Sequence, residues 1–205
     1  MSSTLRNLPR YWIVTVLGVM LTLVAAGGLI GYRVAINRLI DEVSAVDMAF
    51  VKENYGTVSA IADGEPPGAA FDEMLQTEQS RRTVVKVRVY NNQGRIMFST
   101  DIKETGQYPS ETTLNYWRGD LPSVRLTRYR TFDTGGVILM NRDILSTRIG
   151  LGRQGYFTRG SLEVYTDVTA DQRRIVTACL LICGALSVVL ITLPGVLGLL
   201  PRRSQ

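Results

Sequence analysis

Two long uncharged apolar runs, one near each end of the chain, constrain its fold more than any other feature. The first covers residues 11–32 and the second covers residues 175–200. At 1.5 Å of rise per helical residue, about 20 residues cross a hydrocarbon core of about 30 Å. The sequence therefore predicts two transmembrane helices, which separate tails at residues 1–10 and 201–205 from a central segment at residues 33–174.

Aromatic and basic residues flank the first run in the way that is typical of membrane-crossing helices. Tyr11 and Trp12 stand at one end and Tyr32 at the other, and Arg10 and Arg33 close the segment. A cleaved signal peptide is the alternative interpretation, because small residues occur within the run. The run exceeds the roughly 7 to 15 residues of a signal peptide's apolar region, which favours a retained helix.

The distribution of charge predicts the orientation of the chain and argues against nucleic acid as a partner. The formal net charge is +5, but the central segment holds all 18 acidic residues and 19 of the 23 basic ones. The excess of positive charge lies in the tails, at Arg6, Arg10, Arg202 and Arg203. Basic tails beside apolar helices indicate that both termini are cytoplasmic. The central segment is then expected in the periplasm, with the protein in the inner membrane of a bacterium.

The central segment begins with helical patterns and continues with strand patterns. Residues 34–62 carry apolar residues at intervals of three and four, which predicts an amphipathic helix that continues out of the membrane. A second, shorter helix is expected at residues 69–79. Residues 84–101 alternate between apolar and polar on both sides of an Asn- and Gly-containing turn, which predicts a β-hairpin.

Three further strands are predicted, at residues 124–131, 137–142 and 160–168. Residues 110–120 are expected to form a short helix or a loop, and residues 148–155 have no clear pattern. Two helices followed by about five strands predict an α+β domain with an antiparallel sheet.

The chain contains no histidine, and its two cysteines, Cys179 and Cys183, both lie in the second apolar run. Histidine-based catalytic triads and histidine metal sites are therefore excluded. The central segment also lacks the cysteines that a disulfide framework or a zinc site needs. We expect no catalytic residues, no metal and no cofactor, and we expect that the protein is not an enzyme.

The order of these elements resembles a known kind of receptor. The segments VKVRVYNNQGRIMFSTD, then IKETGQ, and finally GSLEVYTDVTADQRRI before the second apolar run carry the resemblance. They are similar to the extracytoplasmic PAS-like (Cache-type) sensor region of bacterial histidine kinases and diguanylate cyclases. The similarity covers roughly residues 10–200.

The resemblance implies a PAS-like antiparallel sheet with a long N-terminal helix and a ligand pocket on the sheet face away from that helix. Such receptors carry an output region after their second membrane helix, whereas this chain ends at residue 205, soon after the second run. We therefore expect a separate partner protein to supply the output.

Polar residues on two strand faces predict a ligand site. One face belongs to the hairpin and the other to the last strand, and their members are Lys86, Arg88, Tyr90, Glu163, Tyr165 and Asp167. If the two faces coincide, they form a patch for a small anionic or zwitterionic ligand, with Arg88 binding a carboxylate through two hydrogen bonds. The candidate ligand-binding residues are Arg88, Tyr90, Tyr165 and Asp167. The alternative is a set of solvent-facing residues joined by cross-strand ion pairs.

Gly27 and Gly31 form a GxxxG motif in the first apolar run. This motif lets two helix backbones approach closely, so we expect a helix contact there and a homodimer as one outcome. Cys179 and Cys183 are four residues apart and share a helix face, where they are expected to serve as small packing residues.

Together these patterns predict a two-pass inner-membrane protein whose periplasmic domain senses a small ligand and signals through a separate partner. One alternative is a structural or assembly factor of the envelope that binds another protein. Another is a receptor remnant that lacks its output domain.

Overall fold

The computed structural model describes residues 10–109, 122–154 and 157–199. It contains two compact units, one formed by Arg38–Gln172 and the other by the two terminal parts, Met1–Asn37 and Arg173–Gln205. The segment at residues 110–120, for which a helix or a loop is predicted, lies outside the described residues.

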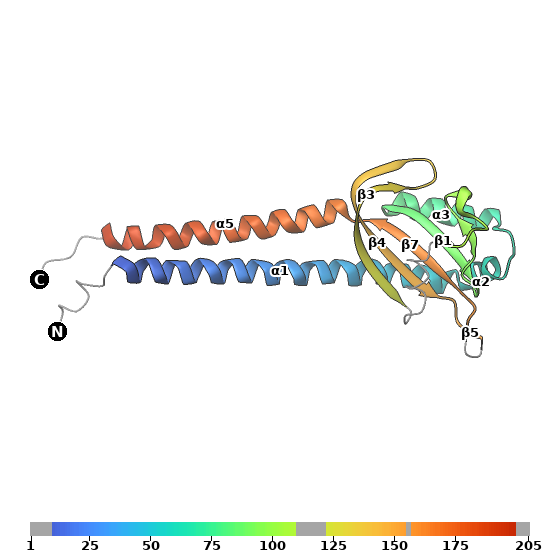
Figure 1. Cartoon of the computed structure of the whole chain (residues 1–205), viewed down its shortest axis with the longest axis horizontal. Helices are drawn as coiled ribbons and strands as arrows, with labels where there is room; N and C mark the ends of the chain where they lie inside the picture. Colours follow the sequence, from blue (N-terminus) through green and yellow to red (C-terminus); the bar gives the residue numbers. More distant parts are fainter. Residues whose placement is uncertain (1–9, 110–121, 155–156, 200–205) are drawn as a thin grey trace, which may run out of the picture. The chain divides into compact units, whose positions relative to one another are not determined.

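Helix α1 (Arg10–Glu53) runs without interruption from the first apolar run into the amphipathic segment (Figure 1). The predicted continuation out of the apolar run is confirmed, but its predicted extent to residue 62 is wrong. The helix ends at Glu53, and a separate helix, α2 (Tyr55–Ala62), follows. Asn54 lies at the break, where its side-chain amide donates a hydrogen bond to the Phe50 carbonyl at 2.9 Å. Such local side-chain bonding competes with the regular helix ladder.

Helix α3 (Ala69–Arg81) confirms the predicted short helix and extends it by two residues. It begins after Gly68, whose backbone is extended, and ends at Arg82, which is extended as well. Extended residues at both boundaries stop the helical hydrogen-bond pattern and lead the chain into the sheet.

The sheet has five antiparallel strands in the order β2-β1-β7-β4-β3. The strands are β1 (Val84–Asn91), β2 (Ile96–Ser99), β3 (Ser123–Asp133), β4 (Ile138–Gly150) and β7 (Gly160–Asp167). A separate two-stranded pair, β5 (Arg153–Gln154) with β6 (Phe157–Thr158), precedes β7. A single 3₁₀ turn, η2 (Ile102–Glu104), follows β2. The predicted α+β class and the antiparallel sheet are confirmed.

Strand β4 is much longer than predicted, because residues 143–149 continue it and are all buried. This half of β4 pairs with β3 on one side and β7 on the other. A central strand that is covered on both faces shows no alternation of apolar and polar residues. Its sequence therefore lacks the period-two signal on which the prediction depended.

Helices cover one face of the sheet with a continuous apolar core. Val87 and Val89 of β1 and Leu162 and Val164 of β7 point toward this face, and each is at most 1% exposed. The helical side of the same core is formed by Phe50, Val51, Val58, Ile61, Ala62, Phe71 and Leu75. The alternating residues of β1 and β7 point to the opposite face, and most of them are polar.

The terminal unit contains the N-terminal part of α1 and most of helix α5 (Thr169–Leu199). Both helices are long and apolar enough to cross a membrane, by length and composition. The second predicted membrane segment, residues 175–200, falls almost entirely within α5.

We expect that Leu162→Ala destabilises the protein by about 2–5 kcal/mol, because Leu162 is fully buried between β1 and the helices and its truncation leaves a cavity. Ile138→Ala serves as the control, since Ile138 is 65% exposed, and its effect is expected to stay within about 0.5 kcal/mol. Denaturant unfolding of the full chain in detergent measures the free energy of unfolding of both variants. Equal losses in the two variants would contradict the described core.

Candidate functional site

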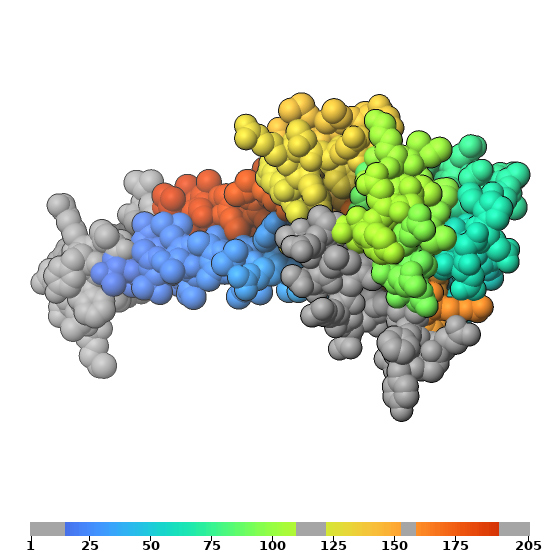
Figure 2. Space-filling model, turned by 45° about the vertical axis from the view of Figure 1, so that its right-hand side comes forward, coloured from blue at the N-terminus to red at the C-terminus, as the bar shows by residue number. Residues whose placement is uncertain are grey.

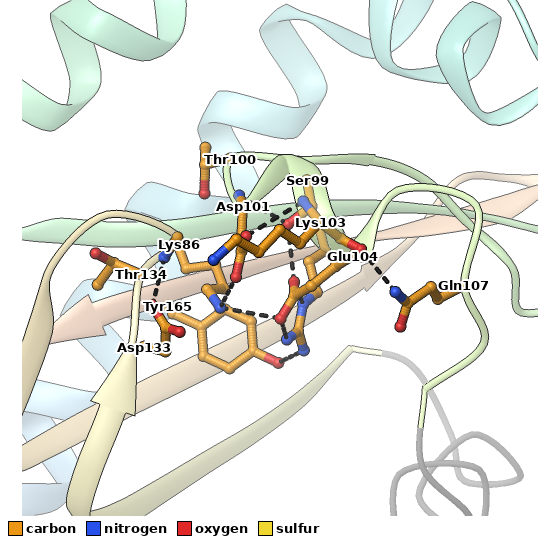
Figure 3. A network of polar contacts seen from close by, with 12 residues as sticks. Lys86, Ser99, Thr100, Asp101, Lys103, Glu104, Gln107, Asp133, Thr134 and Tyr165 are labelled. Carbon is orange, nitrogen blue, oxygen red and sulfur yellow. Dashed lines mark hydrogen bonds and ion pairs between the residues drawn. The ribbon is translucent and has the colours of Figure 1, made fainter.

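Polar side chains gather on the sheet face that the helices leave uncovered. The register pairs Arg88 of β1 with Glu163 of β7, so the two predicted polar faces coincide. We call this group the polar network, and its members are Lys86, Arg88, Tyr90, Ser99, Asp101, Glu104, Glu163 and Tyr165. Figure 3 shows several of them converging from β1, β7 and the η2 segment.

A forked ion pair between Arg88 and Glu104 lies at the centre of the polar network. Arg88 Nε donates to Glu104 Oε2 at 2.7 Å, and Arg88 Nη2 donates to Glu104 Oε1 at 2.5 Å. The remaining terminal nitrogen, Nη1, donates to the Tyr165 hydroxyl at 2.6 Å. This two-bond geometry is the strong form of guanidinium–carboxylate recognition.

Burial by itself raises the pKa of Glu104, but its charged partners outweigh that effect. The hydrogen bonds and charge of Arg88, together with hydrogen bonds from Lys86 and Ser99, lower the pKa from 4.5 to about 2. For Arg88, burial lowers the pKa, and the hydrogen bond with Glu104 and the nearby tyrosines raise it above its ordinary value. Both groups are therefore charged at neutral pH.

A second buried carboxylate, Glu163, accepts a hydrogen bond from the Tyr90 hydroxyl at 2.6 Å. Glu163 also lies 3.9 Å from Arg88 Nη1, and its side chain is 5% exposed. Burial, followed by the negative charge of Glu163, raises the pKa of Tyr90 and of Tyr165. The two tyrosines consequently stay protonated and neutral.

Lys86 places a second positive charge next to two carboxylates, Asp101 and Glu104, on the β2 side of the polar network. Its Nζ donates to Glu104 Oε1 at 3.0 Å and lies 3.5 Å from Asp101 Oδ2. The same ammonium is 5.4 Å from the ring centre of Phe132, a cation–π distance. The Lys86 side chain is only 3% exposed, so these partners take the place of water around its ammonium group.

Arg148 of β4 is a further buried cation on this face, next to the polar network. It is 2% exposed, and its Nε and Nη2 donate to the Ser161 hydroxyl at 3.1 and 3.0 Å. Its guanidinium lies 5.5 Å from the ring centre of Tyr90. The sequence patterns did not single it out, because it belongs to the half of β4 that was not predicted.

The structure brings together three of the four candidate ligand-binding residues. Arg88, Tyr90 and Tyr165 all belong to the polar network, whereas Asp167 lies apart from it. Asp167 Oδ1 accepts a hydrogen bond from the Thr169 backbone N–H at 3.0 Å, and Oδ2 lies 3.3 Å from Arg142 Nη1. It therefore caps the start of α5. The solvent exposure that the alternative expected is wrong for Lys86, Tyr90, Glu163 and Tyr165, which are buried, but the cross-strand ion pair that it expected is present between Arg88 and Glu163.

Glu104, Asp101 and Ser99 are members that the sequence patterns missed. Asp101 accepts a hydrogen bond from the Lys103 backbone N–H, which is a local cap that the sequence could have signalled. Glu104 reaches Arg88 because η2 folds back over β1, which is a tertiary contact without a local sequence signature.

The β3–β4 hairpin closes over one side of the polar network. Phe132 packs against Tyr165 with ring centres 5.5 Å apart. At the tip of the hairpin, Gly135 has φ +94°, and a Cβ there would lie 2.6 Å from the Asp101 Cα. Glycine is therefore required for the tip to rest on Asp101. In Figure 2 the yellow hairpin lies beside the yellow-green segment that contains β2 and η2.

An open groove of about 740 Å³ lies next to the polar network, between α3, β2, η2 and the hairpin tip. Leu75, Gln79, Met97, Ile102 and Val137 are among the residues that line it. None of the four candidate ligand-binding residues does. The groove adjoins the polar network through Ser99, which belongs to the network and also lines the groove.

A buried ion pair on the other face of the sheet connects α1 to the start of β1. Asp47 of α1 is fully buried, and its Oδ1 accepts a hydrogen bond from Arg82 Nη1 at 2.8 Å. Burial raises the pKa of Asp47, and the Thr147 side chain, followed by the hydrogen bond and charge of Arg82, opposes that rise without cancelling it.

The GxxxG residues lie in the terminal unit. A Cβ on Gly27 or Gly31 would have no neighbour within 4 Å, whereas one on Gly28 would collide with the Cys183 Sγ. Within this unit Gly28 therefore makes the close approach to α5. Contact of Gly27 and Gly31 with a second copy stays a prediction.

Among the residues that the structure describes, no group of three or more histidine, cysteine, aspartate or glutamate side chains could hold a metal ion. A scan against protein-family models found no match, and a search of the curated proteins found no significant match.

The Glu104 carboxylate predicts a specific acid sensitivity. Because folding lowers its pKa from 4.5 to about 2, Glu104 stabilises the folded state above pH 4.5, and this contribution is lost as the pH falls toward 2. We expect Glu104→Gln to be less stable than the wild type at neutral pH, with a difference that shrinks over this range. Glu65→Gln, at an exposed position, is the control. A pH-independent difference in the unfolding midpoint would contradict the assignment.

Proposed function

We propose that the protein is a two-pass inner-membrane protein of a bacterium whose periplasmic PAS-like domain senses a small ligand and signals through a separate partner protein. The observation that carries this proposal is the polar network, buried on the sheet face opposite the helices. That is the face on which the family resemblance implies a pocket.

Stability alone does not explain why charged side chains are buried in the polar network. Replacing a buried ion pair with apolar residues of similar volume is often neutral or stabilising, so ion pairs contribute little that an apolar core could not supply. Clusters of buried ionisable groups occur preferentially at functional sites. Lys86, Arg88 and Glu163 are such a cluster, with side chains that are 3%, 18% and 5% exposed.

The chemistry of the polar network fits a small anionic or zwitterionic ligand. Arg88 supplies a planar fork for a carboxylate, and Lys86 adds a second positive charge. Tyr165 supplies a neutral hydroxyl beside them, while Glu163 offers a negative group for an amine. These groups together match the two ends of a compact zwitterion.

A ligand can signal only if it contacts two arrangements of the domain with different free energies. Two strands of the sheet are connected to the candidate membrane helices, β1 to α1 and β7 to α5. Strand β1 follows Arg82, which is bonded to Asp47 of α1. Strand β7 leads directly into α5, where Thr169 also accepts a hydrogen bond from the Asp143 backbone N–H at 2.8 Å. A shift of β1 against β7 would therefore reach both helices.

The groove beside β2 favours a second candidate function, which is binding to another envelope protein without a ligand. Its rim exposes apolar side chains, with Ile102 83% and Val137 61% exposed. Apolar groups that are exposed beside a groove are typical of protein contact sites.

Screening of carboxylates and amino acids by thermal shift, with the full chain in detergent, tests the sensor function. We expect at least one to raise the unfolding midpoint of the wild type. Arg88→Lys keeps the charge but removes the fork, so we expect it to weaken binding by about tenfold or more. Arg128→Lys, at a side chain that is 72% exposed, is the matched control. If no compound stabilises the wild type and a stable protein partner copurifies, the second candidate function is favoured.

Protease treatment of intact spheroplasts tests the proposed location. We expect cleavage within residues 38–172 and protection of epitope tags placed at the two termini, because the proposal puts the domain outside and the tails inside. Permeabilised cells provide the control, in which the tags are cut as well. Protection of the domain together with loss of the tags would reverse the orientation.

A further inference from the structure

We propose that Glu104 is a resident carboxylate which occupies the place of a ligand carboxylate on Arg88, and that a bound ligand displaces it together with the η2 segment. This inference rests on the proposed function and specifies how the same site is regulated. Without ligand, the network would be closed by a group of the chain itself.

The first argument is that Glu104 uses the donors that an external carboxylate would need. Arg88 presents Nε and Nη2 as a parallel pair to the two oxygens of Glu104. Lys86 Nζ and the Ser99 hydroxyl donate to the same two oxygens at 3.0 and 2.9 Å. A free carboxylate in this position would meet all four donors, and the charge of the network would stay the same.

The second argument is that a ligand can reach Arg88 from the solvent. The Glu104 and Arg88 side chains are 22% and 18% exposed, whereas those of Lys86 and Glu163 are 3% and 5% exposed. The forked pair therefore lies at the solvent-accessible end of the network. A ligand can reach Arg88 there without opening the core between the sheet and the helices.

The third argument is that the Glu104 side chain makes the bonds between η2 and strand β1, to Arg88 and Lys86. None of the η2 residues is buried, and Ile102 is 83% exposed. After η2 the chain is tied to β2 again, where Gly106 N–H donates to the Ile96 carbonyl at 2.7 Å. Segments with few buried apolar contacts open at low free-energy cost. Once Glu104 leaves Arg88, η2 can move between fixed points at Asp101 and Gly106.

Displacement of η2 would change the surface beside it. Ile102 and Thr105 line the groove next to β2. Exchange of one carboxylate for another in the network would therefore alter the shape of the groove. This provides the differential contact that a signalling ligand requires.

Chemical rescue tests the inference, with acetate as the probe and the full chain in detergent. Glu104→Ala leaves Arg88 and Lys86 without their shared carboxylate, so we expect acetate to bind this variant at least about tenfold more tightly than the wild type. The unfolding midpoint is titrated with sodium acetate against sodium chloride at equal ionic strength. Hydrogen exchange of residues 102–107 is followed in the same samples, and we expect it to stay fast after acetate has restored stability.

Glu65→Ala is the control, because it also removes a carboxylate but lies at an exposed position outside the polar network and leaves the Arg88–Glu104 pair in place. We expect its affinity for acetate to stay within about threefold of the wild type. Equal acetate binding by both variants, or no acetate binding by Glu104→Ala, would overturn the inference. In that case a metabolite that stabilises the wild type and requires Arg88 would leave the proposed function standing. If acetate rescues Glu104→Ala but no compound stabilises the wild type, the sensor function fails instead.

Discussion

Each buried charge on the sheet face opposite the helices needs a partner of opposite charge, and the Arg88–Glu104 ion pair is the interaction on which the polar network there depends. Its two short hydrogen bonds connect strand β1 to the η2 turn, and the remaining terminal nitrogen of Arg88, Nη1, connects β1 to Tyr165 of β7. Without such partners, a buried guanidinium would carry a large desolvation penalty. The pair therefore determines where η2 lies, and η2 in turn contributes to the groove beside β2.

The two faces of one sheet have opposite chemistry because strand residues alternate in direction. Val87 and Val89 point to the helices, while Arg88 and Tyr90 point to the polar network. A movement of β1 would thus shift side chains in both the apolar core and the polar network. Arg82 extends the same connection to α1 through Asp47, so the polar network is linked through the sheet to a helix that is long enough to cross a membrane.

Local patterns predicted the helices, the first hairpin and the last strand, because each has a clear period of 3.6 or 2 residues. They failed where burial on both faces removed the period, as in the second half of β4 with Arg148. Alternation grouped Arg88 with Tyr90 on one strand face and placed Tyr165 on another, and the register of β1 with β7 joins the two faces. Glu104 could not be grouped with them, since only the tertiary fold brings η2 over β1, and Asp167 was separated from the group by its role as a cap of α5.

A structure of the full chain with a bound carboxylate ligand tests the central claim most directly, namely that the polar network is a ligand site which the chain itself closes. The account predicts the ligand carboxylate on the fork of Arg88, with the Glu104 side chain turned into solvent and η2 displaced. A ligand bound elsewhere, with the Arg88–Glu104 pair intact, would contradict it and identify the network as a purely structural part of the core.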